Sequence, residues 1–197
     1  MEQEDVQQIR QAIRERIIKD RDALPLELRH QFSGAIIGRL HHYLSRKPSR
    51  SIHCYISFRS EVETHDLIEQ ALQKGIQVTV PIVERAGDRP SLSHAGIHDL
   101  NSLVNGPFGV QEPRERKPAS LDELDAVIVP LVAFDRHGTR LGYGKGFYDA
   151  FLRELPRSIE RIGIAYSMQE IDQIPVLSHD EPLDTIVTEK EIIHIHS

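Results

Sequence analysis

Residues 134–149, FDRHGTRLGYGKGFYD, combine alternating glycines with cationic side chains, a combination that could hold an anion. The glycines and the cations are Gly142, Gly144, Gly146, Arg140 and Lys145. Glycine has no Cβ, so its backbone can adopt a positive φ and approach an oxyanion closely. A helical pattern follows, and the free N–H groups and dipole at a helix start favour phosphate. We therefore predict an anion-binding loop that feeds a helix and handles a nucleotide phosphate.

The spacing of these glycines fits neither of two common nucleotide motifs. The Walker A loop needs G-x-x-x-x-G-K-[ST], and the dinucleotide fingerprint needs G-x-G-x-x-G. Taken alone, the segment could also be a tight turn that closes a strand onto a helix. The turn is the weaker interpretation, because turns seldom carry Arg140, Lys145, Tyr143 and Tyr148 so close together.

A helix predicted over residues 3–22 could bring further positive charge to such a loop. Its apolar residues recur three and four positions apart, at Val6, Ile9, Ile13 and Ile17. This is the period of an amphipathic helix with one buried face. At about 100° per residue, Arg10, Arg14 and Arg21 fall along one flank of that face. Arg10 and Arg14 either bind an anion or extend their aliphatic stems along the edge of the core.

The rest of the N-terminal half alternates between helical and strand periods. Pro25 is predicted to begin a second helix that runs to the break at KPSR, and SIHCYISF at 51–58 alternates as a strand does. A short helix follows, opened by the Ser60-x-x-Glu63 spacing and ended by Gly75. It leads to the β-branched strand IQVTVPIV, and a strand, helix and strand of this length favour a parallel pair.

The C-terminal half contains the strand expected at the centre of the sheet. DAVIVPLVAF, at 125–134, is a nearly continuous apolar run, typical of a strand covered by helices on both faces. The glycine loop, a helix beginning near Gly146 and the strands RIGIAY, TIVTE and IIHIH follow. Residues 84–120 are predicted to be mostly loop, with one short strand near Leu92. We expect an α/β fold and a single domain over 1–197.

Composition and charge exclude several classes of protein. Asp plus Glu number 30 against 24 Lys plus Arg, and the net charge of −6 argues against sequence-independent nucleic-acid binding. No run of roughly 18 apolar residues could span a bilayer, and the N-terminus lacks the pattern of a secretory signal. The single cysteine, Cys54, cannot form an intrachain disulfide and fits a reducing compartment. We expect a cytoplasmic monomer without nucleic-acid or membrane partners.

Several motifs in order along the chain resemble the 5-formyltetrahydrofolate cyclo-ligase family, also called methenyltetrahydrofolate synthetases. VPLVAFDRHGTRLGYGKGFYDAFL looks like the family signature. The helix with Arg10 and Arg14, the segment SEVETHDLI, the FGVQEP box at 108–113 and the tail IPVLSHDEPLDTIVTE extend the likeness. The resemblance implies a three-layer α/β/α fold with a mainly parallel central sheet, in the NagB/RpiA/CoA-transferase-like architecture.

The resemblance implies an ATP- and Mg²⁺-dependent closure of 5-formyltetrahydrofolate to 5,10-methenyltetrahydrofolate, with release of ADP and phosphate. A formyl oxygen is a poor leaving group, and transfer of the γ-phosphoryl group would convert it into phosphate. Catalysis of this kind depends mainly on alignment and charge stabilisation. The alternative is a non-catalytic α/β domain that binds a phosphorylated metabolite, because one architecture can serve sensing as well as chemistry.

By position, the resemblance also assigns an ATP site and its catalytic groups. Its residues would be Arg10, Arg14, Arg140, Leu141, Gly142, Tyr143, Gly144, Lys145, Gly146, Phe147 and Tyr148. Lys145 and Arg140 would stabilise charge on the transferring group. The family commonly has lysine where Arg10 stands, and a planar guanidinium contacts phosphate differently from an ammonium group.

The resemblance further implies a folate site and two magnesium ligands. The folate site would comprise Ile56, Glu61, Tyr143, Lys145 and Phe147. The Glu61 carboxylate would accept from the N–H edge of the pterin. Asp149 and Asp180 would hold Mg²⁺ directly or through water. Asp149 could instead offset its helix dipole, and Glu61 could simply be acidic before a helix, a role that Glu63 and Asp66 already fill.

The other histidines and the cysteine are not predicted to form a site. His94 and His98 have the i, i+4 spacing of metal ligands, but a glycine lies between them in an expected loop, which favours a solvated pair. His194 and His196 lie at a terminal strand edge. Cys54 alternates with polar neighbours and is most simply a small buried apolar residue.

Overall fold

The structure is a computed structural model that describes residues 3–47, 49–84, 91–106 and 109–195. Its helices are α1 (Gln3–Asp22), α2 (Leu26–Leu44), α3 (His65–Gln73) and α4 (Phe147–Glu154), with short 3-10 turns at Leu100–Ser102 and Ser167–Gln169. The main strands are β1 (Ser51–Cys54), β2 (Gln77–Glu84), β3 (Ser91–Ile97), β6 (Ala126–Val129), β9 (Glu160–Ile164), β10 (Thr185–Val187) and β11 (Ile192–His194). Two small hairpins pair β4 (Leu103–Asn105) with β5 (Gln111–Pro113), and β7 (Ala133–Phe134) with β8 (Arg140–Leu141).

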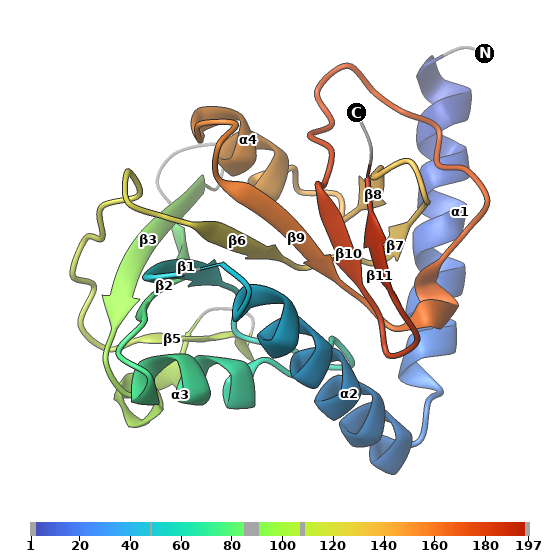
Figure 1. The fold of residues 1–197 in the computed structure, drawn as a ribbon. Helices are drawn as coiled ribbons and strands as arrows, with labels where there is room; N and C mark the ends of the chain where they lie inside the picture. The colour runs from blue at the N-terminus through green and yellow to red at the C-terminus, as the bar shows by residue number, and fades with distance from the viewer. Residues whose placement is uncertain (1–2, 48, 85–90, 107–108, 196–197) are drawn as a thin grey trace.

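The fold is an α/β fold around a seven-stranded sheet in the order β11-β10-β9-β6-β1-β2-β3 (Figure 1). The five inner strands are parallel, and β3 and β11 run antiparallel at the two edges. The predicted α/β class with a mainly parallel sheet is confirmed. The more specific likeness to the NagB/RpiA/CoA-transferase-like architecture stays a prediction.

Helices cover both faces of the sheet (Figure 1). On one face, α2 and α3 pack Leu40 and Ile68 into a core with the strands. On the other face, α4 contributes Phe151 and Leu152 to a second core. Helix α1 lies beside the β7–β8 hairpin, where Ile17 belongs to a third apolar cluster. Burying each large apolar side chain contributes about 1.5–3 kcal/mol. Ile17, with the partly buried Ile13 and Ile18, therefore fixes this helix and its arginines against the end of the sheet. Ile9, predicted on the same buried face, is 40% exposed, so that prediction is wrong for the first half of the helix.

The direction in which the chain builds the sheet reverses between β1 and β6. From β1 the chain passes through α3 to β2 on one side, and from β6 it passes through α4 to β9 on the other. In open α/β sheets, ligands bind beyond the carboxyl ends of the strands at such a switch point. The segments that follow β1 and β6, which contain Glu61 and the glycine loop, lie at that position in the topology.

Several local predictions are confirmed. The predicted helix over 3–22 has the bounds of α1. Helix α2 begins one residue after Pro25, which is its N-cap. Gly75, with a φ of 74°, follows the end of α3, and β1 and β2 form the expected parallel pair. Cys54 is completely buried, as predicted, although its polar neighbour His53 is buried as well, so burial does not alternate along β1.

Other local predictions are wrong. DAVIVPLVAF is two strands rather than one, because Pro130 interrupts the run between β6 and β7. The Ser60–Glu63 capping box does not form: Ser60 donates its hydroxyl hydrogen to Asp22, and α3 begins only after Thr64.

The loop expected over 84–120 contains more structure than the sequence indicated. Strand β3 pairs with β2 over seven residues, and β4 and β5 form a hairpin beyond it. His94 lies on β3 and stacks on Phe151, with ring centroids 4.1 Å apart, so it is not part of a solvated pair with His98. Residues 85–90 and 107–108 of this stretch lie outside the described residues, as does His196. Among the described helices, none is long and apolar enough to cross a membrane.

Candidate active site

The predicted anion-binding segment forms a β-hairpin followed by a short loop. Asp135 holds the hairpin turn, since its Oδ1 accepts the backbone N–H groups of His137 and Thr139 at 3.0 Å each. Residues 142–146 then lead into α4. Gly144 and Gly146 have φ values of 86° and 70°, a region that favours glycine. No side chain among the described residues caps α4, so N–H groups of its first turn remain available to an anion.

Arg14 reaches this loop from α1. Its Nε donates to the carbonyl oxygen of Gly142 at 2.8 Å, and its guanidinium carbon lies 3.6 Å from the position that a Cβ of Gly144 would occupy. Burial, and then the neighbouring Arg10, lower the pKa of Arg14. A bound anion would stabilise this crowded positive charge. The fold therefore brings Arg14 and the glycine loop, which are distant in sequence, into direct contact.

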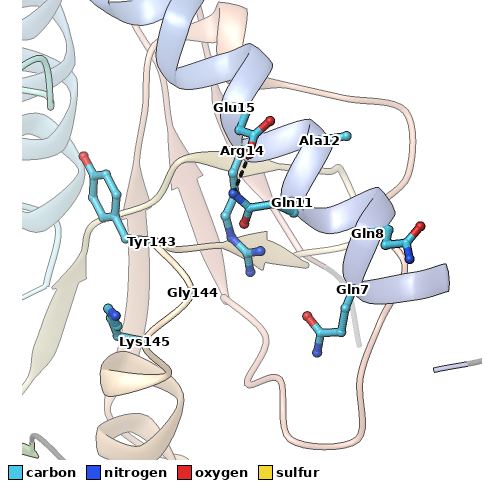
Figure 2. A pocket seen from close by; sticks show the side chains of 9 residues that line it. All are labelled: Gln7, Gln8, Gln11, Ala12, Arg14, Glu15, Tyr143, Gly144 and Lys145. Carbon is cyan, nitrogen blue, oxygen red and sulfur yellow. Dashed lines mark hydrogen bonds between the residues drawn. The ribbon is translucent and has the colours of Figure 1, made fainter. Parts of the chain in front are cut away.

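An open cleft of about 660 Å³ lies between α1 and the glycine loop (Figure 2). It is lined by Gln7, Gln8, Gln11, Ala12, Arg14, Glu15, Tyr143, Gly144 and Lys145. Figure 2 shows Tyr143 and Lys145 opposite α1, with the guanidinium of Arg14 extending from the helix toward the loop. Glutamine amides of α1 supply neutral hydrogen-bonding groups, and the cations lie where the loop meets the helix.

Arg10 does not line this cleft and is paired with Asp180. Its two terminal nitrogens donate to the two carboxylate oxygens at 2.5 and 2.8 Å, and Nη1 also donates to the carbonyl oxygen of Pro175. Only 5% and 7% of the Arg10 and Asp180 side chains are exposed. Burial acts to raise the pKa of Asp180, but the hydrogen bonds from Arg10 and from the Leu177 N–H outweigh it, so the pKa is lowered.

Arg140 is likewise held by neighbours beneath the loop. Its Nη2 donates to Oδ1 of Asp149 at 2.9 Å, and its Nη1 donates to the carbonyl oxygen of Glu181. Burial lowers the pKa of Arg140, against the opposing charge of Asp149. Leu141 is completely buried beside Ile17 in the cluster under α1, so only its main chain could meet a ligand.

The two predicted magnesium ligands fit a metal to different degrees. No group of three or more His, Cys, Asp or Glu side chains occurs among the described residues, but Mg²⁺ commonly uses only one or two protein carboxylates. Oδ1 of Asp149 accepts from Arg140 and from the Glu181 N–H, and no described residue donates to its Oδ2. Asp180 uses both oxygens on Arg10. Asp149 thus fits the role directly, and Asp180 fits it once Arg10 releases an oxygen.

Glu61 lies in a tight turn after β1. Its Oε2 accepts the N–H of Phe58 at 2.8 Å, and Arg59 within the turn has a left-handed φ of 55°. Burial raises the pKa of Glu61, while the Phe58 N–H, Arg21 and Tyr143 act to lower it. Ile56, between β1 and this turn, is 4% exposed. The carboxylate is thus largely removed from water, which strengthens any hydrogen bond that it makes to a ligand.

The α4 side of the site presents three different environments. Lys145 is exposed and lines the cleft. Phe147 is half-buried at the first position of α4. Tyr148 turns inward, with its ring 6.1 Å from that of Phe151, and its buried hydroxyl has no hydrogen-bond partner in the described part of the chain.

Arg21 is a residue of the site to which the sequence assigned no role. Only 1% of it is exposed, and it donates to the hydroxyl oxygens of Tyr143 and Ser60 at 2.5 and 3.1 Å. The helical period placed Arg21 on the same flank as Arg10 and Arg14, and this was the available signal. Its partners lie in segments 39 and 122 residues away, beyond what periodicity can identify.

The family model for the 5-formyltetrahydrofolate cyclo-ligase family matches residues 6–189. The chain belongs to this family. It is 32% identical over 177 residues to a 5-formyltetrahydrofolate cyclo-ligase of Escherichia coli (strain K12), covering 87% of this chain and 96% of the relative. The corresponding protein of Haemophilus influenzae is 32% identical over 183 residues, covering 91% and 97%.

Solved structures agree with this assignment. The NMR structure of Aquifex aeolicus 5,10-methenyltetrahydrofolate synthetase superposes with a TM-score of 0.82 at 30% identity, covering 96% of this chain and 94% of that one. The family resemblance carried by the sequence motifs is therefore confirmed, and with it membership of a family of ligases.

The cyclo-ligase cleft has unbalanced positive charge. Among the predicted site residues, Asp180 offsets Arg10 and Asp149 offsets Arg140. Arg14 and Lys145 line the cleft, and neither forms a salt bridge to a described residue. Glu15 is the one acidic side chain among the lining residues, and it accepts a hydrogen bond from Gln11. The cleft therefore favours a ligand that carries negative charge.

Proposed function

We propose that this cyclo-ligase closes 5-formyltetrahydrofolate to 5,10-methenyltetrahydrofolate in a reaction that consumes ATP and requires Mg²⁺. The γ-phosphoryl group is transferred to the formyl oxygen, and ADP is released. The second nitrogen then attacks the activated formyl carbon and loses its proton. The C–O bond breaks, and the former formyl oxygen leaves as part of inorganic phosphate.

The observation that carries this proposal is the meeting of Arg14, Lys145 and the glycine loop at one cleft. Arg14 bonds the loop at Gly142, and Lys145 lines the same cleft two residues before α4. A triphosphate lying there would meet two cations and the N–H groups of the first turn of α4. Its negative charge would offset the repulsion between Arg14 and Arg10.

Lys145 is the residue proposed to stabilise the transferring phosphoryl group. Its ammonium group is not held by a described carboxylate, so it can contact the phosphoryl group as that group passes from ADP to the formyl oxygen. Removal of one group that stabilises charge developing in the transition state typically costs about 2.7–4 kcal/mol of barrier. Arg140 is proposed to act indirectly, because it positions Asp149 and the main chain of Glu181.

The folate is proposed to lie toward Glu61 and Tyr143. The Glu61 carboxylate can accept two neighbouring N–H groups of a pterin ring, provided that Oε2 is shared with the Phe58 N–H. Tyr143 is 43% exposed, and its ring can pack against a flat ligand. Phe147 and Ile56 would supply the apolar remainder of that wall.

Asp149 is proposed to hold Mg²⁺, with Asp180 joining it after exchange with Arg10. The ion supplies charge neutralisation for the phosphate oxygens when it is bound. Release of Asp180 would also free the guanidinium of Arg10, which could then meet a phosphate. The paired arginines and aspartates would thus exchange partners when the charged co-substrate arrives.

The proposal is tested by mixing purified protein with 5-formyltetrahydrofolate, ATP and Mg²⁺ and following the near-ultraviolet absorbance of the methenyl product. We expect product only in the complete mixture, with one ADP formed for each product molecule. Omission of ATP, or of Mg²⁺ with added chelator, should abolish the signal. A folded protein that binds ATP but forms no product would contradict the proposal and favour a non-catalytic metabolite-binding domain.

A further inference from the structure

The guanidinium of Arg21 joins three segments that are distant in sequence. It extends from the last turn of α1 and donates to the hydroxyl oxygens of Tyr143 and Ser60 and to the carbonyl oxygen of Leu131. Tyr143 belongs to the glycine loop, Ser60 precedes Glu61 after β1, and Leu131 follows β6. Arg21 thus contacts the segments that follow β1 and β6, the two strands at the switch point.

Burial of this charge is not explained by an ion pair. Arg21 is 1% exposed, and no carboxylate in the described part of the chain lies within salt-bridge distance of it. Asp22, its neighbour, is bonded to Ser60 instead. Removing a guanidinium from water is costly unless its N–H groups are satisfied. All three of its acceptors are neutral oxygens, two of them in segments that border the proposed folate site.

The hydrogen bond to Tyr143 also determines what the tyrosine can do. A guanidinium has only donors, so the phenolic oxygen of Tyr143 must accept, at 2.5 Å. The hydroxyl hydrogen is then directed away from Arg21 and is available to another acceptor. The Arg21 guanidinium carbon also lies 5.8 Å from the ring centroid, which restricts the tilt of a side chain that is otherwise 43% exposed.

We propose that Arg21 is a positioning residue for the folate, which locks Tyr143 and the Ser60–Glu61 turn into one wall. The inference rests on the proposed function, because it assumes that this wall faces the folate. It predicts that, without Arg21, Tyr143 and the Ser60–Glu61 turn are no longer held together and folate binding is weakened. The Arg14–Gly142 contact and the phosphate end of the cleft are retained.

Four variants test this role: Arg21→Lys, Tyr143→Phe, the double variant, and Arg16→Lys as the matched control. Lysine keeps the charge of Arg21 but cannot span three acceptors. Phenylalanine keeps the ring of Tyr143 and removes only its hydroxyl. Arg16 is an exposed arginine on the same helix. For each protein we would measure the Kd of 5-formyltetrahydrofolate without ATP, the Kd of a non-hydrolysable ATP analogue, and Tm.

We expect Arg21→Lys and Tyr143→Phe each to raise the Kd of 5-formyltetrahydrofolate by about tenfold or more, as the loss of a hydrogen bond to a charged group predicts. The Kd of the ATP analogue should change by less than about twofold, and the double variant should bind no more weakly than the worse single variant. Arg16→Lys should match the wild type. If Arg21→Lys does not fold, Tyr143→Phe gives the same selective effect.

Two results would overturn the role of Arg21 without touching the proposed function. One is wild-type folate binding in Arg21→Lys. The other is an equal weakening of both ligands with a lowered Tm, which indicates a purely structural residue. Failure of the wild-type protein to bind or convert 5-formyltetrahydrofolate would instead contradict the proposed function itself.

Discussion

Substitution of Lys145 by alanine tests whether this residue acts as a catalytic cation or only belongs to a structural turn. Lys145 is exposed and makes no hydrogen bond or salt bridge to a described residue, so its truncation should change the free energy of unfolding by less than about 0.5 kcal/mol. Loss of one group that stabilises charge in the transition state should lower kcat by about 10²- to 10³-fold. Activity should therefore fall by a factor that stability does not explain.

The assay compares kcat, both KM values and Tm for Lys145→Ala and for Lys19→Ala, an exposed lysine on α1 that does not line the cleft. We expect wild-type kinetics for Lys19→Ala. For Lys145→Ala, kcat should fall far more than KM for 5-formyltetrahydrofolate rises, because the interaction is strongest in the transition state. Full turnover in Lys145→Ala, or a loss of Tm that accounts for the lost activity, would refute the assignment.

Three further predictions follow from individual residues. Gly144→Ala places a Cβ at a φ of 86°, so unfolding should be easier by about 1–2 kcal/mol and KM for ATP should rise; Gly142→Ala, without a positive φ, should cost less stability, and equal losses would contradict this. Glu61→Gln should raise KM for 5-formyltetrahydrofolate by about tenfold or more and leave KM for ATP unchanged; equal changes in both would argue against a pterin acceptor. Burial acts to raise the pKa of Glu160, but hydrogen bonds from Tyr43 and Lys47 lower it overall. Its stabilising effect is therefore present above the usual glutamate pKa of about 4.3 and is lost as the pH falls through the lowered value. Urea unfolding of Glu160→Gln should show a weaker loss of stability on acidification, and an unchanged pH profile would contradict this origin.

The sequence predicted best where structure depends on neighbours along the chain. The period of Val6, Ile9, Ile13 and Ile17 gave the bounds of α1, although of the four only Ile17 is fully buried and Ile9 is 40% exposed. The glycine loop and α4 were likewise predicted from residues that are close together along the chain. The motif resemblance also identified the family, since several ordered motifs are more specific than any one of them.

The short strand predicted near Leu92 exists as β3, but its full length was missed because SLSHAGI has no clear apolar alternation of its own. Its seven residues pair with β2, so its length depends on the neighbouring strand and not on a pattern in its own sequence. A continuous motif can also mislead about individual residues. Leu141 lies within the signature, yet its side chain belongs to the core under α1, and both residues of β8 are buried.

The paired side chains of the site could not be predicted from the sequence. Arg10 and Asp180 are separated by 170 residues, and Arg21 and Tyr143 by 122. Periodicity gives the face of a helix that a side chain occupies, but the partner depends on how helix, loop and sheet edge pack together. The pairing of both predicted metal carboxylates with arginines is for this reason a finding of the structure.

The central claim, that the formyl oxygen leaves as phosphate, is tested most directly with an isotope. 5-Formyltetrahydrofolate labelled with ¹⁸O in the formyl group would be converted in unlabelled water with ATP and Mg²⁺, and the inorganic phosphate analysed by mass spectrometry. The account predicts one labelled oxygen in the phosphate for each methenyl product formed. Unlabelled phosphate, with the ¹⁸O recovered in water, would contradict it.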